Sequence, residues 1–326
     1  MQTPMLSVII PAFNASTTII ETLNSLYTNV KSSFEVIIVE DNSTDTTMET
    51  VENFITHNSK NNVRVLVNEK NCGPGVSRDL GLTQARGDFI LFFDGDDILR
   101  PHAVDAAVSL LAERNLDVVL LPYNIIYGSQ KTEIGMWEPD KAIFDALSVV
   151  PKAEIRPAEF PTLLSLTNYP WNKIVRKSFL EEIDFSFGAL RLHEDIMAHW
   201  QILMNSDTVL ISQIPICDYY YNPNGNSATN NKTTLRLQAI DALRELYAYL
   251  TSSARYQFAI PTYIEFSINL ISWAYTNIHS DYREEFTKRA RDLLIKYELR
   301  DLQRIFHRDR NVYSKIYSIL VRCEVN

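Results

Sequence analysis

Residues 89–97 read Phe-Ile-Leu-Phe-Phe-Asp-Gly-Asp-Asp, so that an apolar run passes directly into three carboxylates. A short apolar run that ends at turn residues is typical of a buried strand. Neighbouring carboxylates repel one another and lose hydration when enclosed, unless a cation compensates their charge. The stretch therefore predicts a strand that ends in a site for a divalent metal ion, with Asp94, Asp96 and Asp97 as candidate ligands. A solvated acidic turn is the alternative.

Upstream of this stretch, short apolar runs alternate with segments of helical spacing. The apolar runs, which we predict to be strands, are residues 6–10, 34–39, 63–67 and 89–93. Helices are predicted between them, over residues 15–27, from the polar turn 40–45 to Phe54, and over 73–85. This alternation indicates a parallel sheet with crossover helices. Ligands of such sheets bind at the carboxyl ends of the strands, so the polar turns that follow the strands predict a site at one edge.

The regular alternation ends near residue 123. Residues 128–170 form a loop-rich segment with several prolines, and helical spacing returns at 171–180 and 194–204. Residues 235–326 show apolar stripes at helical spacing and are predicted to be almost wholly helical. At about 150 residues per domain, the chain is long enough for two domains.

The composition narrows the functional class. The chain has 326 residues, of which 46% are hydrophobic and 22% charged, and this excludes a disordered or collagen-like protein. Its formal net charge of −9 argues against nucleic acid as a partner, because nucleic-acid binding relies on basic residues that neutralise phosphates. Basic residues nevertheless outnumber acidic ones between Arg283 and Arg322. The C-terminal part is therefore a basic extension of an acidic body.

The cysteines and the N-terminal residues indicate a cytoplasmic protein. Cys72, Cys217 and Cys323 are widely spaced and form no CxxC pair, which is typical of a reducing compartment. The first residues lack a basic segment, and the apolar run 6–10 is too short for a signal peptide. No stretch reaches the roughly 18 apolar residues of a transmembrane helix. We expect any contact with the inner face of the membrane to be peripheral.

Four stretches resemble, in order and spacing, the signatures of the inverting family-two glycosyltransferases with the GT-A fold. They are residues 8–14 (Val-Ile-Ile-Pro-Ala-Phe-Asn), 40–45 (Glu-Asp-Asn-Ser-Thr-Asp), 71–81 and 93–97 (Phe-Asp-Gly-Asp-Asp), followed more loosely by 171–173, 193–195 and 219–229. The resemblance implies an α/β fold, in which a Rossmann-like nucleotide-binding sheet has flanking helices, here joined to an all-helical C-terminal region. It also implies a catalytic domain over residues 1–230, with a nucleotide-sugar-binding half (1–125) and an acceptor-binding half (126–230). Residues 231–326 would be the C-terminal helical region.

The resemblance assigns residues to the binding of a UDP-sugar donor. In the family an aromatic residue after the first strand packs on the base, which matches Phe13, and an acidic residue after the second strand accepts a hydrogen bond from uracil, which matches Asp41. A helix cap is the alternative role of Asp41. Arg78 matches a basic residue near the nucleotide, although the family usually has Asn where this chain has Asp79. The other candidate donor contacts are Pro11, Ala12, Asn14, Asp94, Gly95, Lys173 and Ser227.

The acidic triplet of the family maps onto Asp94, Asp96 and Asp97. Asp96 is the expected direct ligand of Mn²⁺ or Mg²⁺, with Asp94 nearer to the ribose or a bound water. The family's cation offsets the charge of the diphosphate leaving group. Trp171 resembles an element on the acceptor side that offers a flat face to a sugar, and a core position is its alternative. The stretch 219–229 resembles a loop that closes over the diphosphate, although it lacks the arginine that many relatives have there.

A second carboxylate is needed because an alcohol is a weak nucleophile at neutral pH. Asp195 matches the catalytic base of the family. Glu194 matches a residue that supports this base or contacts the acceptor. Carboxylates in the first turn of a helix are also favoured by the helix dipole, which is the alternative explanation of this pair. A single displacement assisted by one base inverts the anomeric configuration.

These features predict a metal-dependent, inverting hexosyl- or N-acetylhexosaminyltransferase. It would move a sugar from a UDP-sugar to a hydroxyl of a growing cell-surface polysaccharide, lipid-linked glycan or glycopolymer. One alternative is a non-catalytic nucleotide-sugar-binding protein, in which Asp195 would lie away from the acidic triplet. Another is a sugar nucleotidylyltransferase, although residues 11–14 are not its Gly-rich phosphate loop. For the C-terminal helices, packing on the catalytic domain, a homo-oligomer contact and peripheral contact with anionic lipid stay open.

Overall fold

The computed structural model describes residues 4–128, 130–148, 154–222, 230–298, 301–303 and 314–315. Its main sheet has eight strands in the order β3-β2-β1-β4-β10-β6-β11-β9. These strands are β1 (Leu6–Ala12), β2 (Phe34–Glu40), β3 (Val63–Val67), β4 (Phe89–Phe92), β6 (Val118–Leu120), β9 (Glu154–Ile155), β10 (Lys173–Arg176) and β11 (Val209–Ile211). The strands β1 to β4 are mutually parallel, whereas β10 runs antiparallel to β4 and β6. The predicted α/β fold with its parallel N-terminal sheet is confirmed.

The strands β1, β2 and β4 are buried on both faces, and crossover helices flank the N-terminal sheet. These are α1 (Ile19–Asn29), α2 (Thr47–His57), α3 (Pro74–Gln84) and α4 (Ala103–Arg114). Successive residues of a strand point to opposite faces, so Ile9 and Ile37 belong to one core cluster and Val8 and Val36 to the other. Parallel pairing brings the carboxyl ends of β1, β2 and β4 to the same edge, with Ala12 opposite Glu40 and Ile9 opposite Phe92.

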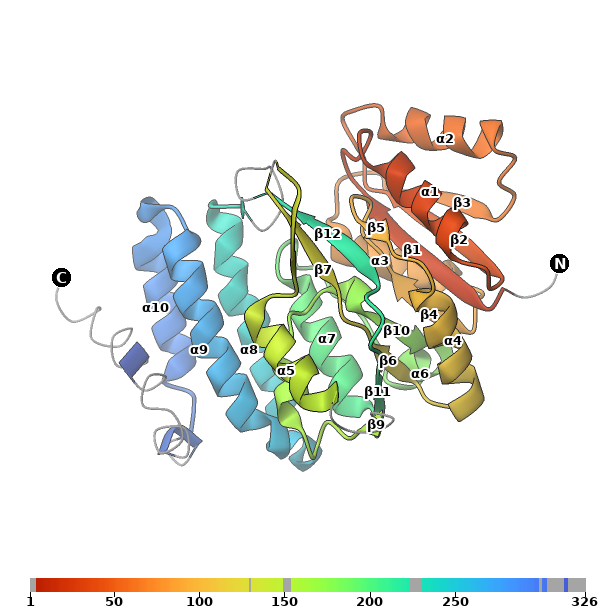
Figure 1. Cartoon of the computed structure of the whole chain (residues 1–326). Helices are drawn as coiled ribbons and strands as arrows, with labels where there is room; N and C mark the ends of the chain where they lie inside the picture. The colour runs from red at the N-terminus through yellow and green to blue at the C-terminus, as the bar shows by residue number, and fades with distance from the viewer. Residues whose placement is uncertain are drawn as a thin grey trace.

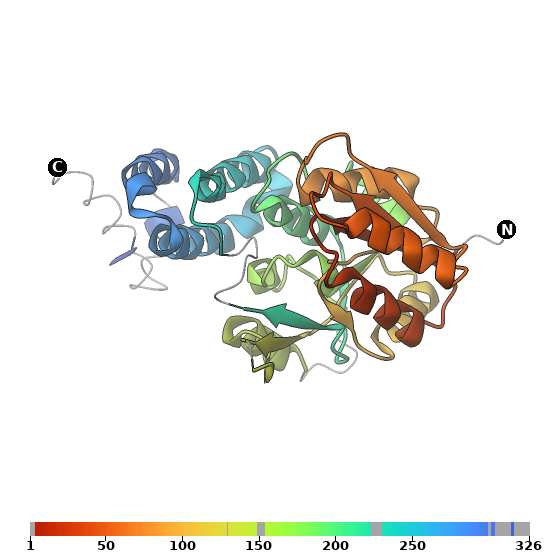
Figure 2. The ribbon, with the colours of Figure 1, turned by 90° about the horizontal axis from the view of Figure 1, so that it is seen from above.

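A second, smaller sheet has the strand order β5-β12-β7-β8. Its strands are β5 (Ile98–Leu99), β7 (Asn124–Tyr127), β8 (Thr132–Gly135) and β12 (Cys217–Tyr221), and it is accompanied by α5 (Glu138–Ser148). Seen from above, β7, β12 and α5 form a layer that is separate from the main sheet (Figure 2). The small sheet begins directly after the acidic turn, since β5 follows Asp97.

The helical prediction for residues 171–180 is wrong in its first half. The structure has the short 3₁₀ helix η2 (Pro170–Asn172), then β10, and only then α6 (Lys177–Glu182). Ile174 and Val175 are fully buried in a strand that pairs with both β4 and β6. Pairing with strands distant in sequence therefore overrides the helical spacing of this short apolar run.

The predicted helical C-terminal region is confirmed for residues 234–294. It consists of α8 (Gln238–Thr251), α9 (Ile260–Asn277) and α10 (Arg283–Leu294), with the short 3₁₀ helices η4 (Thr234–Leu237), η5 (Ala254–Ala259) and η6 (Ser280–Tyr282). These helices stand side by side with α7 (Glu194–Asn205), at the end of the molecule remote from β1 (Figure 1). Leu243 and Phe286 belong to the same core cluster as Ile9, so this region packs on the sheet domain.

Residues 299–300, 304–313 and 316–326 of the C-terminal part lie outside the described residues. Within the described ranges, no helix is both long and apolar enough to cross a bilayer. The remaining short 3₁₀ helix, η1 (Pro161–Ser165), packs against α7 and α9.

Candidate active site

The end of β1 and the turn after it carry several of the predicted site residues, at the carboxyl edge of the parallel strands. Phe13 follows β1 and is 47% exposed, so its ring is available to a planar ligand. Of its neighbours, Ala12 is buried at the end of β1, and Asn14 accepts a hydrogen bond from the backbone N–H of Thr44 at 2.8 Å. Pro11 lies within β1, opposite Val39. The turn after β1 is thus fixed to the turn after β2.

Asp41 follows β2 and is almost completely buried. Its Oδ1 accepts hydrogen bonds from Asn68 Nδ2 at 2.7 Å and Cys72 N at 2.8 Å, and its Oδ2 accepts one from Gly73 N at 2.8 Å. Gly73 has a φ of 92°, a conformation that favours glycine. Asp41 therefore holds the turn that opens α3.

A different carboxylate, that of Asp45, bonds the first residue of α2. Asp45 Oδ1 accepts hydrogen bonds from the backbone N–H and the hydroxyl of Thr47, at 2.9 and 2.5 Å. Partial enclosure alone would raise the pKa of Asp45, but hydrogen bonds from Ser16 and Thr47 outweigh it and lower that pKa to about 2. The helix-cap alternative for Asp41 is therefore not what the structure has.

Arg78, on α3, connects the acidic turn with the start of α7. Its side chain is 4% exposed, with Nη2 at 2.7 Å from Asp94 Oδ1 and Nη1 at 2.9 Å from Glu194 Oε1. The guanidinium also lies over the Phe187 ring, 5.2 Å from its centroid. The family resemblance places this arginine near the nucleotide, and the structure commits it to two carboxylates.

The neighbouring Asp79, at the position where the family usually has Asn, holds the loop before α7. Its carboxylate accepts hydrogen bonds from Ser186 Oγ at 2.6 Å, Phe187 N at 2.9 Å and Gly188 N at 3.2 Å. Burial raises the pKa of Asp79, while these bonds oppose the rise. An asparagine has only one acceptor oxygen, so three donors at this position favour a carboxylate.

The three carboxylates after β4 have different surroundings. Asp94 is partly exposed and paired with Arg78, whereas Asp96 is exposed. Desolvation by the surrounding protein, and then the charge of Asp94, raise the pKa of Asp96 to about 6. Asp97 is buried, its Oδ1 accepts a hydrogen bond from Tyr220 N of β12 at 3.3 Å, and its Oδ2 has no partner among the described residues. Burial and both neighbouring carboxylates raise its pKa well above the ordinary value.

This donor set fits a divalent cation that is bound together with a diphosphate. Among the described residues, no three His, Cys, Asp or Glu side chains converge on one point. Mg²⁺ and similar hard cations are usually held by one or two carboxylates plus phosphate oxygens and water. Asp94 and Asp96 can supply those carboxylates, while Asp97 contacts the small sheet instead. A Cβ at Gly95, between them, would lie 3.2 Å from Ile19 Cδ1, so the turn packs closely on α1.

The second group of predicted residues lies at the start of α7. His193 precedes this helix with a φ of 68°, and Glu194 and Asp195 occupy its first turn. Neither carboxylate oxygen of Asp195 has a hydrogen-bond partner among the described side chains and backbone. Burial, and next the charge of Glu194, raise the pKa of Asp195 to about 7, although Arg78 and Lys173 oppose the rise.

Lys173, at the start of β10, is almost completely buried near Asp195. Its Nζ donates to the backbone carbonyl of Tyr169 at 2.6 Å. Burial lowers the pKa of Lys173 to about 7, and the charge of Asp195 opposes the shift. Lys173 and Asp195 thus each have a pKa shifted to about 7. Both side chains line the same cavity.

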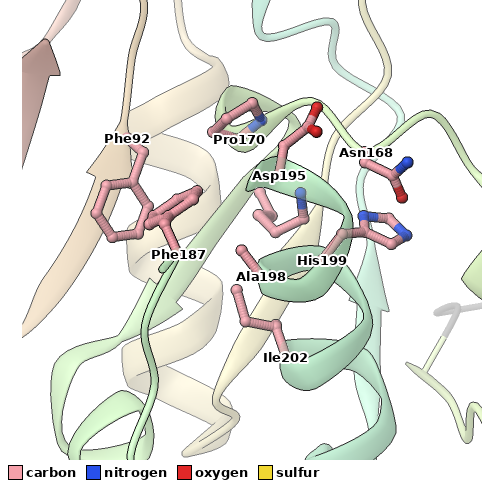
Figure 3. A pocket seen from close by; sticks show the side chains of 9 residues that line it. Phe92, Asn168, Pro170, Phe187, Asp195, Ala198, His199 and Ile202 are labelled. Atoms are coloured by element: carbon pink, nitrogen blue, oxygen red, sulfur yellow. The ribbon is translucent and has the colours of Figure 1, made fainter. Parts of the chain in front are cut away.

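A small cavity adjoins Asp195. It is lined by nine side chains, among them Asp195, Lys173, Asn168 and His199 along with apolar ones such as Phe92 and Ile202 (Figure 3). Its volume of about 10 Å³ for the centre of a water-sized sphere is enough for about one water molecule. The cavity is therefore far too small for a sugar.

The expected sugar-binding face of Trp171 is not available. Trp171 is fully buried, and its ring is stacked on Tyr169 with centroids 4.4 Å apart and an interplanar angle of 12°. The core position given as its alternative is the one observed. Ser227, in the loop expected to close over the diphosphate, lies outside the described residues.

The sequence marks Asp79 only as a departure from the family pattern, and its contacts with Ser186, Phe187 and Gly188 could not be predicted because these residues are more than 100 positions away. The buried positions of Asn168 and His199 beside the cavity were not predicted either. His199 carried one usable signal, because it lies four residues after Asp195 and therefore on the same face of a helix.

A Rossmann-like sheet with carboxylates at its edge and a further carboxylate pair at the start of α7 defines the GT-A class of fold. Residues 7–184 match the sequence model of the family described as "Glycosyl transferase family 2", and the chain belongs to this family. The resemblance noted from the motifs is thereby confirmed.

Several relatives of this chain are bacterial glycosyltransferases. The chain is 38% identical over 125 residues to the poly(ribitol-phosphate) beta-N-acetylglucosaminyltransferase TarS of Staphylococcus aureus, a match that covers 37% of this chain and 21% of TarS. It is 24% identical over 208 residues to glycosyltransferase GlyG of Streptococcus pneumoniae, covering 64% of this chain and 68% of GlyG. To the beta-1,3-glucosyltransferase WfgD of Escherichia coli, which uses UDP-Glc and a diphosphoundecaprenol-linked acceptor, it is 25% identical over 194 residues (56% and 74% covered).

The fold is that of TarS over nearly the whole chain. The structure superposes on residues 1–349 of S. aureus TarS in complex with UDP-GlcNAc with a TM-score of 0.77 and 22% identity. The superposition covers 97% of this chain and 89% of that chain. The sequence match spans about a fifth of the length of TarS, and the superposition shows that the two chains share the fold.

Proposed function

We propose that this protein is a metal-dependent, inverting glycosyltransferase that moves a hexose or N-acetylhexosamine from a UDP-sugar to a hydroxyl of a glycan. The observation that carries the proposal is the pair of contacts made by Arg78. These contacts fix Asp94, which follows β4, and Glu194, which precedes Asp195, on the buried guanidinium of Arg78. A diphosphate at the sheet edge and an acceptor beside Asp195 would then lie within reach of one another.

Binding of the donor would use the edge of the parallel sheet. Phe13 is exposed enough to stack on a uracil ring. A carboxylate oxygen has two lone pairs, so Asp41 can accept a hydrogen bond from the uracil N–H besides those it already accepts. Bound Mn²⁺ or Mg²⁺, held by Asp94 and Asp96, would offset the charge of the diphosphate leaving group.

Transfer would begin when the Asp195 carboxylate accepts the proton of the acceptor hydroxyl. The alcohol oxygen bonds to the anomeric carbon as the bond from that carbon to the diphosphate oxygen breaks, and UDP leaves. A base whose pKa is near the working pH combines a useful ionised fraction with proton affinity, and the pKa of Asp195, raised to about 7, meets this condition. Glu194 and Arg78 would orient the helix turn that carries the base.

The relatives support the class of acceptor. TarS and WfgD act on a polyol-phosphate polymer and on a diphosphoundecaprenol-linked sugar, so we propose a cell-surface polysaccharide, lipid-linked glycan or glycopolymer as the acceptor here.

We also propose that residues 1–230 form the catalytic domain, with its donor half at 1–125 and its acceptor half at 126–230. Residues 231–326 would be its helical extension, in a cytoplasmic protein. We further propose that the basic C-terminal stretch makes peripheral contact with anionic lipid. We also propose that the protein forms a homo-oligomer.

A panel of nucleotide sugars tests this function. The protein is incubated with UDP-, GDP- and dTDP-sugars and Mn²⁺, and release of the nucleoside diphosphate is followed. Slow hydrolysis of one or a few UDP-sugars is expected even without an acceptor. Absence of release from every sugar, together with UDP binding, would favour the non-catalytic alternative.

A further inference from the structure

The loop that leads into α7 is attached to the C-terminal helical region. Gln238 is the first residue of α8, which packs beside α7 (Figure 1). Its Oε1 accepts hydrogen bonds from the backbone N–H groups of Arg191 and Leu192, both at 3.0 Å. Backbone N–H groups of a loop have no partner from regular secondary structure, so one side-chain oxygen that serves two of them fixes the path of the chain.

His193, the next residue, contacts two further side chains of the same region. The centroid of its ring lies 6.2 Å from that of the Trp273 ring on α9, at an interplanar angle of 89°. The Arg236 guanidinium, from η4, lies over the same Trp273 ring, 4.5 Å from its centroid. Burial, and next the charge of Arg236, lower the pKa of His193 to about 3, so its ring is a neutral aromatic partner of the indole.

The backbone of His193 explains why these contacts matter. Its φ of 68° lies in the left-handed region, which is uncommon for a residue with a side chain. Such a conformation is costly and persists only where the surrounding structure determines it. The carbonyl of His193 accepts a hydrogen bond from Ile196 N at 3.3 Å, which closes the first turn of α7 around Glu194 and Asp195. The direction of Asp195 is therefore set by the residue at which the chain enters the helix.

The same loop also packs closely on α3 and on the turn before it. A Cβ at Gly75 would lie 2.9 Å from Glu194 Cγ, and one at Gly73 would lie 3.4 Å from Arg191 Cα. Gly73 belongs to the turn that Asp41 holds. The entry to α7 is thus in contact with the carboxyl edge of the sheet as well as with the helical region.

We infer that Gln238 and Trp273 are positioning residues for Asp195, through which the C-terminal helical region takes part in the transfer reaction. They hold residues 191–193, and these residues set the direction of the base. The inference rests on the proposed function, because it concerns the base of that reaction. The helices α8 and α9 lie outside residues 7–184, so this role comes from a part of the chain beyond the match to the family model.

Two variants remove the contacts one at a time. Gln238→Met keeps the size of the side chain and removes the acceptor, and Trp273→Ala removes the indole beside His193. The kcat and the KM are measured with the UDP-sugar that the nucleotide-sugar panel identifies, and UDP binding is measured by calorimetric titration. We expect kcat to fall about tenfold in each variant, because a misplaced base loses much of its contribution to the rate. The KM for the UDP-sugar and the affinity for UDP should not change.

The controls separate positioning from a loss of stability. A stoichiometry of one UDP per chain shows that a lower kcat does not come from unfolded protein. Trp273→Phe keeps an aromatic ring beside His193 and should recover most of the rate. Leu250→Val loosens the buried core about three turns further along α8. This variant should lower the melting temperature and leave kcat at the wild-type value.

A wild-type kcat in either Gln238→Met or Trp273→Ala overturns the inference, and so does an equal fall of kcat in Leu250→Val. Weaker UDP binding that accounts for the fall also overturns it, because the contacts would then serve the donor. If Gln238→Met does not fold, Trp273→Ala tests the same loop, since Trp273 is 38% exposed. If Asp195→Asn abolishes transfer while the other two variants keep the wild-type kcat, only the inference fails. If Asp195→Asn transfers normally, the proposed function itself fails.

Discussion

Arg78 Nη1 lies 2.9 Å from Glu194 Oε1, although the two residues are 116 positions apart in the chain. The same guanidinium reaches Asp94 at 2.7 Å, and all three side chains meet where α3 approaches α7. The buried guanidinium of Arg78 thus fixes the acidic turn after β4 relative to the first turn of α7, which holds Asp195. Removing one partner of such a network leaves a buried charge without compensation.

Substitution of Arg78 by Met is therefore expected to be strongly destabilising. The two carboxylates would lose their common partner, and the free energy of unfolding should fall by about 3–5 kcal/mol. Urea unfolding measures this loss. Arg156→Met removes an exposed pair with Glu159 and should cost less than about 1 kcal/mol. Equal losses in the two variants would contradict the role of Arg78.

Asp195→Asn should stabilise the protein in a pH-dependent way. The pKa of Asp195 is raised in the folded protein to about 7, so the neutral acid contributes stability at low pH that is lost as the pH rises through about 7. Asparagine carries no charge at any pH. The variant should therefore exceed the wild type in melting temperature clearly at about pH 8 and much less at about pH 5. A difference in melting temperature that does not change with pH would show that Asp195 is not desolvated.

Phe13→Ala should weaken the binding of UDP without affecting the fold. The ring is 47% exposed and so contributes little to the core, whereas base–aromatic stacking is worth about 1–3 kcal/mol. Calorimetric titration should show UDP affinity lower by about tenfold or more, with the melting temperature nearly unchanged. Phe13→Tyr, which keeps the aromatic face, is the matched control. Undiminished affinity in Phe13→Ala would move the base-binding site elsewhere.

Asp79→Asn restores the residue usual in the family and should nevertheless destabilise this chain. One acceptor oxygen cannot serve Ser186 Oγ and the backbone N–H groups of Phe187 and Gly188 as a carboxylate does. The expected loss in the free energy of unfolding is about 1–2 kcal/mol. Asp184→Asn, at an exposed position, serves as the comparison and should be neutral. If Asp79→Asn is as stable as the wild type, the loop before α7 is held by other contacts.

Asp96→Asn tests the metal site. With Asp94 paired to Arg78, Asp96 is the exposed carboxylate available to a cation. Wild-type protein should gain thermal stability from UDP and Mn²⁺ together beyond the gain from UDP alone, and the variant should lose this increment. A Mn²⁺-dependent increment of the same size in the variant would remove Asp96 from the metal site.

The N-terminal half of the fold follows from the sequence because its signals are local. The β-branched run 6–10, the Gly-Pro-Gly opening of α3 and the apolar run before Asp94 each mark one element without reference to the rest of the chain. The strand β10 could not be predicted in this way, because its four residues become a strand only through pairing with β4 and β6.

The candidate site shows the same difference between features that local sequence signals predict and features that depend on tertiary contacts. The turns that carry Phe13, Asp41 and Asp96 follow strands, so their common edge is predictable from topology. The partner of Arg78 and the covering of Trp171 by Tyr169 are tertiary contacts that no spacing in the sequence reveals. The same holds for the convergence of Asn168 and His199 on one cavity.

The central claim is that Asp195 is the base of a single displacement at the anomeric carbon. The most direct measurement is the ¹H NMR spectrum of the product formed from an α-linked UDP-sugar, for the wild type and for Asp195→Asn. We expect a β-linked product from the wild type and none from Asp195→Asn, although that variant still binds UDP. An α-linked product, or turnover by Asp195→Asn, would contradict the claim.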